Sequence, residues 1–270
     1  MNRIREFLAE DVGDGDITSD ILIGRQNGKA HITAGVDCTL AGLEEAAEVF
    51  GFLGLEVILK AADGQKVTEG AEVMVISGEL KKILMGERLA LNFLMHMSGI
   101  ATATRAVMDE CRLVNGAIHI AATRKTTPGF RVYEKKAVRL GGGDPHRARL
   151  DDGILIKDNH LAVVGSITEA VTRAKSYSFA KKVEVEVESL NGAQEAAKAG
   201  ADIIMLDNMT PSQAKAAYTL IKGIDKRIVV EVSGGITPSN APEYAAFADI
   251  ISMGWITHSA PAVQFSLHIV

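Results

Sequence analysis

KVEVEVES, residues 182–189, alternates valine and glutamate without interruption. Because successive side chains of a strand point to opposite faces, the three valines would share one face and Glu184, Glu186 and Glu188 the other. In a barrel the valines would pack against helices and the glutamates would point inward. Inward carboxylates are costly unless cations, water or a metal ion compensate them. A solvated edge strand is the alternative, although the segments on both sides have helical patterns.

Similar short apolar runs recur through the second part of the chain, separated by helix-like segments. They are AIHIAA (117–122), GILIK (153–157), KVEVEVES, DIIMLDN (202–208), RIVVEVSGG (227–235) and DIISMG (249–254). The alanine-rich segments after Ser189 and Thr210 have helical spacing, and these two residues are candidate N-caps. The alternation predicts parallel strands covered by helices, and in a (β/α) barrel the carboxyl ends of such strands form the functional face.

The first part of the chain has a different pattern, typical of a separate α+β domain. Residues 29–42 resemble a pair of strands, and residues 55–78 resemble a hairpin that turns at Asp63-Gly64. Residues 79–111 have helical character for most of their length, with a break expected at Ser98-Gly99. We therefore expect two domains, residues 1–110 and residues 111–270.

Composition excludes several classes of function. The 270-residue chain carries a formal net charge of −5, which argues against a general nucleic-acid binder. Its two cysteines lack CxxC spacing and its first residues are charged, so a reducing cytoplasm is the expected compartment. No apolar run approaches the roughly 20 residues that a membrane helix needs, and no membrane association is expected.

Positive charge is nevertheless concentrated in residues 121–150, which hold eight lysines and arginines against Glu134 and Asp144. TRKTTPGFR (123–131) places part of this charge directly after a predicted strand. Such a local cluster in an acidic protein indicates a site for a small anion. Arg124, Lys125 and Arg147 are the stronger candidates because of their strand-end and turn positions, whereas Lys135 and Lys136 are expected to be solvated on a helix.

Glycine-containing loops complete the predicted functional face. GGGDPHR (141–147) is too flexible for a helix and would bring His146 and Arg147 back over the site. SGGI (233–236) and MGWITHS (253–259) follow the last two predicted strands. In barrels of this kind the last loops commonly bind phosphate through backbone N–H groups, which glycine allows to approach closely. The histidines lack the spacing of a zinc site.

Taken in order, these motifs resemble the quinolinate phosphoribosyltransferase family over nearly the whole chain. The motifs that carry the resemblance are EDVGDGDITSD (10–20), GERLALNFLMHMSGIAT (86–102), TRKTTPGFR, GGGDPHR, LIKDNHL (155–161), VEVEVES, IIMLDNM (203–209), VEVSGGI (230–236) and ISMGWITHS (251–259). The resemblance implies an α/β protein with an N-terminal α/β sandwich domain and an incomplete (β/α) barrel, the type II phosphoribosyltransferase fold. It also implies a homodimer or larger homo-oligomer with shared active sites.

The implied reaction joins quinolinate to phosphoribosyl pyrophosphate, with Mg²⁺, and releases nicotinate mononucleotide, pyrophosphate and CO₂. Position by position, the resemblance implies that the quinolinate carboxylates are held by Arg88 of a neighbouring subunit and by Arg124, His146, Arg147 and Lys157. It implies that phosphoribosyl pyrophosphate is bound by Lys125, Glu186, Asp207, Asn208, Ser233, Gly234, Gly235, Gly254 and His258. Catalytic roles fall on Lys125, Glu186 and Asp207, and the two carboxylates are expected to hold Mg²⁺ directly or through water.

Four other interpretations stay open at this point. The chain could be a paralogue of the ModD-like type with a different acceptor, although Lys157 favours quinolinate. A nicotinate phosphoribosyltransferase would need to hold only one carboxylate. An aldolase could use Lys157 as a Schiff base, but nearby arginines would keep that lysine protonated. A non-catalytic barrel that binds sugar phosphates would leave the inward glutamates unexplained.

Overall fold

The computed structural model describes residues 3–270, so the first two residues of the expected N-terminal domain lie outside it. Backbone contacts divide the chain into two compact units. Among the described residues, the first comprises residues 3–105, 136–142 and 260–270, and the second comprises residues 106–135 and 143–259. A single boundary at residue 110 is expected from the sequence, whereas residues 136–142 and 260–270 return to the first unit.

A four-stranded antiparallel sheet forms the framework of the first unit, in the order β12-β1-β5-β3. Its strands are β12 (Phe265–Ile269), β1 (Asn27–Ala34), β5 (Glu72–Glu79) and β3 (Glu56–Leu59). A separate pair joins β2 (Cys38–Thr39) to β4 (Lys66–Val67). The expected pairing within residues 29–42 is therefore wrong, because β1 and β2 belong to different sheets.

The hairpin expected in residues 55–78 is correct in its pairing and wrong in its turn. Strands β3 and β5 do pair in antiparallel fashion, but their connection includes β4 and is longer than a tight turn. Asp63 serves another purpose in that connection, because its Oδ1 accepts a hydrogen bond of 2.9 Å from the backbone N–H of Leu43. Leu43 is the first residue of α3, so the carboxylate caps a helix.

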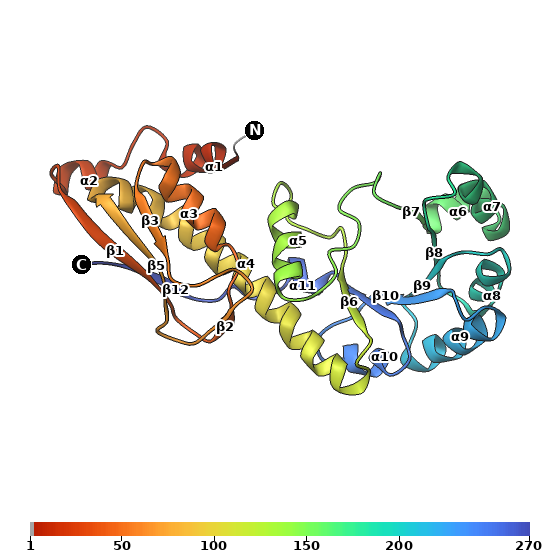
Figure 1. The fold of residues 1–270 in the computed structure, drawn as a ribbon. Coiled ribbons are helices and arrows are strands. Elements are labelled where there is room, and N and C mark those ends of the chain that lie inside the picture. Colours follow the sequence, from red (N-terminus) through yellow and green to blue (C-terminus); the bar gives the residue numbers. More distant parts are fainter. Residues whose placement is uncertain (1–2) are drawn as a thin grey trace. The chain divides into compact units, whose positions relative to one another are not determined.

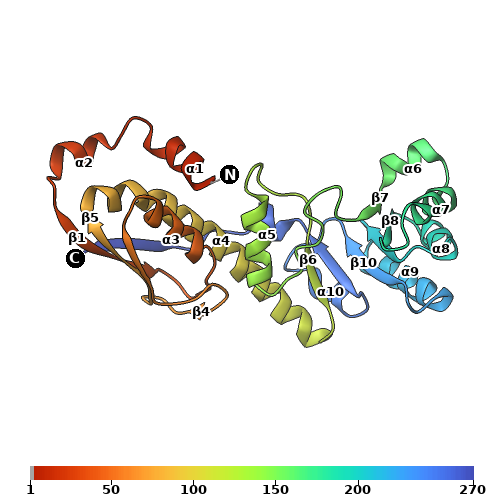
Figure 2. The same cartoon turned by 45° about the horizontal axis from the view of Figure 1, so that its top comes forward.

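Helices α1 (Arg3–Val12), α2 (Ile17–Leu22), α3 (Leu43–Phe52) and the start of α4 (Leu80–Val114) accompany this sheet (Figures 1 and 2). The break expected at Ser98-Gly99 is wrong, because α4 continues through both residues. A Cβ at Gly99 would lie 2.2 Å from the carbonyl oxygen of Pro261, so glycine here permits a close backbone approach. The Ser98 hydroxyl donates to the carbonyl of Ala41, 3.0 Å away.

The second unit contains a six-stranded parallel sheet in the order β6-β11-β10-β9-β8-β7. Its strands are β6 (His119–Ala122), β7 (Ile154–Ile156), β8 (Val183–Val187), β9 (Ile203–Asp207), β10 (Val229–Ser233) and β11 (Ile250–Met253). Each coincides with one of the apolar runs identified in the sequence. Because β6 and β7 are the two edges, the curved sheet is an incomplete barrel, and the predicted fold class is confirmed (Figure 1).

Helices connect these strands, and most of them lie on the outer side of the curved sheet (Figure 1). They are α5 (Arg131–Leu140), α6 (Asp158–Val164), α7 (Ile167–Tyr177), α8 (Leu190–Lys198), α9 (Pro211–Ile224), α10 (Ala241–Ala245) and α11 (Trp255–His258). The predicted caps are confirmed, since Ser189 accepts from the N–H of Gly192 and Thr210 from that of Gln213. Within residues 3–270, no helix combines the length and the apolarity required to cross a membrane.

Strand β8 shows why the alternating sequence matters. Val183, Val185 and Val187 are buried, as expected for residues that pack against the covering helices. Glu184 and Glu186 are also buried, which confirms that this strand is not a solvated edge, whereas Glu188 is exposed beyond the strand end. The barrel therefore contains carboxylates that need compensation from neighbouring groups.

Candidate active site

The carboxyl ends of the parallel strands surround a cavity of about 320 Å³. Its lining combines cationic, acidic and small polar side chains, as a site for a charged metabolite requires. The lining residues are Ala122, Thr123, Arg124, Lys125, His146, Arg147, Leu155, Lys157, Glu186, Met205, Asp207, Glu231, Ser233 and Ser252. Strands β6, β7, β9 and β10 each end in, or are followed by, a charged or polar residue of this set, whereas β8 contributes Glu186 and β11 contributes Ser252 from within the strand.

A second hollow of about 200 Å³ adjoins this cavity and shares Thr123, Lys125, Ser233 and Ser252 with it. Its remaining lining comes from the loops after β10 and β11, namely Gly234, Gly235, Ile236, Thr237, Gly254, Trp255 and His258. These are the two loops for which the sequence predicts a phosphate site.

Gly234 is required by the geometry of this hollow. Its φ is +82°, and a Cβ there would lie 2.4 Å from Asn208 Oδ1 and 2.5 Å from the Asn208 backbone nitrogen. Asn208 itself has a φ of 55°, and its backbone N–H donates to the carbonyl of Ser233 at 3.0 Å. The turn after β9 and the loop after β10 are thus held together, which joins this predicted phosphate hollow to the carboxylate of the adjacent Asp207.

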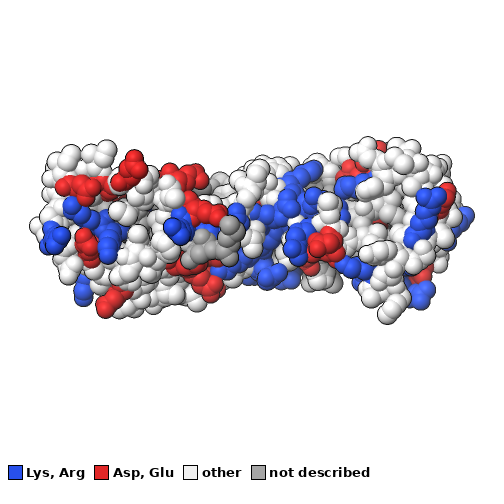
Figure 3. Space-filling model, turned by 90° about the horizontal axis from the view of Figure 1, so that it is seen from above, with Lys and Arg blue, Asp and Glu red and all other residues white. Residues whose placement is uncertain are grey.

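Several cationic side chains line the cavity, and lysines and arginines gather near the middle of the face seen in Figure 3. The Arg124 Nε is buried and, within residues 3–270, has no hydrogen-bond partner. Burial and the neighbouring Arg124 guanidinium lower the pKa of Arg147. Two partly buried guanidiniums so close to one another favour a ligand with more than one negative charge.

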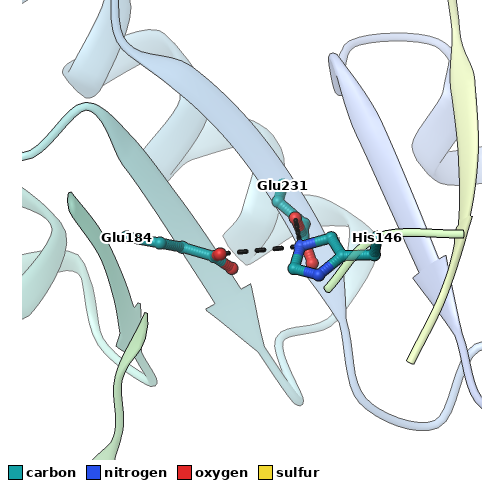
Figure 4. Close-up of side chains that lie close together, drawn as sticks. All are labelled: His146, Glu184 and Glu231. Carbon is teal, nitrogen blue, oxygen red and sulfur yellow. Dashed lines mark ion pairs between the residues drawn. The ribbon is translucent and has the colours of Figure 1, made fainter. Parts of the chain in front are cut away.

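His146 lies between two buried glutamates that project from β8 and β10 (Figure 4). Its Nε2 is 3.5 Å from Glu184 Oε2 and 3.5 Å from Glu231 Oε2. The interactions with Glu184 and Glu231 raise the pKa of His146 to about 10, and burial raises the pKa of Glu184. The two glutamates therefore favour a proton on Nε2, the ring nitrogen that faces them.

The three side chains have the spacing of metal ligands, but the hydrogen bonds of His146 do not suit a metal at Nε2. The backbone N–H of Arg147 donates to His146 Nδ1 at 2.8 Å, so the Nε2 carries the ring proton and directs it to the carboxylates. A metal-bound histidine has the opposite arrangement, in which the other ring nitrogen is the donor. His146, Glu184 and Glu231 thus form a cluster in which the Nε2 proton of the histidine faces both carboxylates.

Besides Glu231, the cavity is lined by two carboxylates near the ends of β8 and β9, Glu186 and Asp207. Burial and the negative charge of Glu186 raise the pKa of Asp207, although Lys157 opposes this effect. A cation beside both oxygens would relieve that repulsion. Hard carboxylate ligands of this kind fit Mg²⁺, which keeps several waters and binds one or two protein carboxylates.

Most of the site residues predicted from the sequence lie together around the two hollows. Asn208 lies next to them through its contact with Gly234, whereas Arg88 is exposed on α4 in the first unit. The expectation that Lys135 is solvated is wrong, because its side chain is buried. Lys136 is half-buried and pairs with Glu44 and Glu45. Sequence reasoning missed Thr123 and Ser252, whose only signal is their position near strand ends.

Comparison with known proteins places this geometry in context. Residues 16–98 match the family description "quinolinate phosphoribosyl transferase, N-terminal domain", and residues 100–268 match its C-terminal domain. The chain is 47% identical over 274 residues to a probable nicotinate-nucleotide pyrophosphorylase (carboxylating) of Methanothermobacter thermautotrophicus, covering 100% of this chain and 98% of that protein. It is 39% identical to the human nicotinate-nucleotide pyrophosphorylase (carboxylating), over 92% of this chain and 84% of the human protein. The crystal structure of NadC from Streptococcus pyogenes superposes with a TM-score of 0.92 at 40% identity, covering 100% of this chain and 96% of that one.

Proposed function

Because the chain belongs to the quinolinate phosphoribosyltransferase family and is an enzyme, we propose that it transfers phosphoribosyl from phosphoribosyl pyrophosphate to quinolinate with decarboxylation. The products would be nicotinate mononucleotide, pyrophosphate and CO₂, in the synthesis of NAD. The observation that carries this proposal is the single cavity in which Arg124, His146, Arg147 and Lys157 converge beside a glycine-lined hollow. That much positive charge suits an acceptor with two carboxylates better than one with a single carboxylate.

The two hollows suggest how the substrates divide the site. Quinolinate would lie against the cations of the larger cavity, and the 5-phosphate would lie against Ser233, Gly234 and Gly235 in the smaller one. Gly254 and His258 would contact the same phosphate from the loop after β11. Lys125 and Ser233 line both hollows, so they would face the ribose between the two ends. This arrangement would hold the ring nitrogen of the acceptor near the reacting ribose carbon.

Glu186 and Asp207 would act on the ribose. As the bond from the ribose to pyrophosphate breaks, positive charge develops on the sugar, and fixed carboxylates beside it would stabilise that charge. Lys125 would favour the negative charge that develops on the leaving group. Mg²⁺, held by Glu186 and Asp207 directly or through water, would neutralise pyrophosphate oxygens when bound.

The decarboxylation would draw mainly on the chemistry of the substrate. Once the ring nitrogen is bonded to ribose it carries positive charge next to the carbon that holds the 2-carboxylate. The bond to that carboxylate breaks, its electron pair stays on the ring carbon beside the cationic nitrogen, and this carbon then takes a proton from solvent. Arg124 and Arg147 would keep the ring in place while CO₂ leaves.

We also propose that active sites are shared within a homodimer or larger homo-oligomer, in which Arg88 reaches the cavity of a neighbouring subunit. Its exposure on α4 is compatible with such a role. Arg88→Ala and Lys125→Ala subunits should each be inactive, and mixing them should regain roughly a quarter of wild-type activity, because each mixed dimer has one intact site. No regain after demonstrated subunit exchange would refute sharing. The expected compartment is the cytoplasm, which the two free, buried cysteines of the described chain support.

Product analysis tests the proposed function. Purified protein is incubated with phosphoribosyl pyrophosphate and either quinolinate or nicotinate, with Mg²⁺ or with EDTA, and nucleotides are identified by liquid chromatography and mass spectrometry. Nicotinate mononucleotide formed from quinolinate, and only with Mg²⁺, is the expected result. A mononucleotide from nicotinate alone, or none from either acceptor with folded protein, would require a different acceptor.

A further inference from the structure

Lys135 is a buried cation that contacts the backbone of the acceptor site. It projects from α5, its side chain is 5% exposed, and it does not belong to the lining of the described cavity. Its Nζ donates to the carbonyl oxygens of Pro145, Arg147 and Ala122; the Arg147 bond is 3.2 Å long and the Ala122 bond 3.4 Å. The three donors of the ammonium group thus have three carbonyl acceptors.

The acceptors of Lys135 are placed where they control the site. Pro145 and Arg147 flank His146, whose backbone has a left-handed φ of 51°, a conformation that costs energy for a residue other than glycine. Ala122 ends β6, two residues before Arg124. One ammonium group therefore holds the strained turn that presents His146 and Arg147, and joins it to the strand that presents Arg124.

Arg131 lies one helical turn earlier on the same face of α5 and repeats this connection. Its Nη1 donates to the carbonyl of Ala148 at 2.9 Å, its Nη2 to the carbonyl of Arg124 at 3.4 Å, and its Nε to Thr126 Oγ1 at 2.8 Å. The two side chains together link the loop after β6 to residues 145–148. A charge buried in this way is costly and persists where its hydrogen bonds organise the surrounding backbone.

We propose that Lys135 is a positioning residue for the acceptor: it fixes the relative placement of Arg124, His146 and Arg147, and so determines quinolinate affinity without touching the substrate. This inference rests on the proposed function for the identity of the acceptor. Apart from Thr123, Lys125 and Ser252, the phosphate hollow is lined by Ser233 and by the loops after β10 and β11, which Lys135 does not contact through any hydrogen bond among residues 3–270, so binding of phosphoribosyl pyrophosphate should depend on it less.

The test compares Lys135→Met, which removes every donor, with Lys135→Gln, which keeps an amide NH₂, and with Lys136→Met as a neighbouring control. The KM for quinolinate should rise by about tenfold or more in Lys135→Met and by less in Lys135→Gln, whereas the KM for phosphoribosyl pyrophosphate stays within about threefold of wild type. Backbone amide hydrogen exchange in residues 143–149 should be faster in Lys135→Gln than in wild type, and faster still in Lys135→Met. Lys136→Met should leave both readouts at their wild-type values.

An unchanged quinolinate KM in folded Lys135→Met, or an equal rise in both KM values, would overturn the inference. If Lys135→Met does not fold, Lys135→Gln and Arg131→Lys give the same comparison, because each removes part of the bonding and keeps a polar side chain. If wild-type protein does not use quinolinate, the proposed function fails, and hydrogen exchange alone decides the positioning role: unaltered exchange in residues 143–149 would exclude it.

Discussion

Lys157 Nζ donates directly to Glu186 Oε2, so a cation at the end of β7 and a carboxylate at the end of β8 form an ion pair at the cavity. The pair joins a residue proposed for the acceptor to one proposed for the ribose. Burial and Glu186 raise the pKa of Asp207 and Lys157 opposes this rise, so the lysine interacts with both carboxylates. Lys157 thus connects the proposed acceptor position with the carboxylates of Glu186 and Asp207.

Removal of that side chain should weaken acceptor binding selectively. Lys157→Met is expected to raise the KM for quinolinate by about tenfold or more, since a charge-assisted contact to a carboxylate is lost. Steady-state kinetics with each substrate varied in turn provide the measurement. Lys175→Met is a matched control, because the Lys175 side chain is 41% exposed against 42% for Lys157 and also pairs with a carboxylate, that of Asp202. Equal effects of the two substitutions would contradict the assignment.

The phosphate hollow should not tolerate a side chain at Gly234. Gly234→Ala would bring a Cβ to 2.4 Å from Asn208 Oδ1, and the loop would have to move. Gly200→Ala has the same backbone requirement, with a φ of +83° against +82°, yet its Cβ would meet nothing within 4 Å in the described chain. We expect Gly200→Ala to cost about 1 kcal/mol of stability and Gly234→Ala clearly more, with a raised KM for phosphoribosyl pyrophosphate. Denaturant unfolding and kinetics of both variants test this, and similar losses would refute the role of the close contact.

Lys135 gives the protein a pH dependence with two opposite signs. Burial lowers its pKa from 10.5 to about 8, with Arg131 and Arg124 adding to the effect and Asp144 and Asp152 opposing it. Between these pH values the unfolded chain binds more protons than the folded one, so the stability of wild type relative to Lys135→Met should rise with pH from about 8 to about 10.5. Quinolinate affinity should fall as the pH rises through about 8, the pKa of Lys135 in the folded protein, because the deprotonated amine has only two donors for three carbonyls.

Urea unfolding at about pH 7.5 and about pH 9.5, with quinolinate KM measured at both, checks these signs. In Lys135→Met the part of each trend that comes from this group should disappear. Identical pH profiles in wild type and variant would show that another group is responsible.

The two cysteines should be unreactive in the folded protein. Burial raises the pKa of Cys38 and of Cys111 to about 11, so only about one molecule in a thousand carries either thiolate at about pH 8. Titration with Ellman's reagent should detect no fast-reacting thiol in native protein and both thiols after denaturation. Rapid modification of either cysteine without unfolding would be inconsistent with the described packing.

Strand positions could be predicted because apolar runs and valine-glutamate alternation are local properties of the sequence. The polar residues after those strands then defined most of the site, since parallel strands bring their carboxyl ends to one edge. Pairing partners are not local, and nothing in residues 265–269 indicates that β12 lies beside β1. Gly99 predicts a helix break because glycine disfavours helix interiors, and the close approach of Pro261 that explains this glycine is not visible in the sequence.

Lys135 shows the same limit within the site. The sequence places it beside Lys136 on an amphipathic helix, where lysines are usually solvated. Its burial depends on the path of residues 143–149, which bring the carbonyls of Pro145 and Arg147 to its ammonium group. Glu184 can be recognised from the sequence as an inward-facing carboxylate, but the contact that it shares with Glu231 at His146 depends on that same path.

Release of ¹⁴CO₂ from quinolinate labelled in its 2-carboxylate tests the central claim most directly. We expect release only when phosphoribosyl pyrophosphate, Mg²⁺ and the protein are all present, in a one-to-one ratio with nicotinate mononucleotide formed. Quinolinate labelled in its 3-carboxylate should instead leave the label in the nucleotide. Failure of folded wild-type protein to release CO₂ under these conditions, or release that does not require phosphoribosyl pyrophosphate, would contradict the proposed reaction.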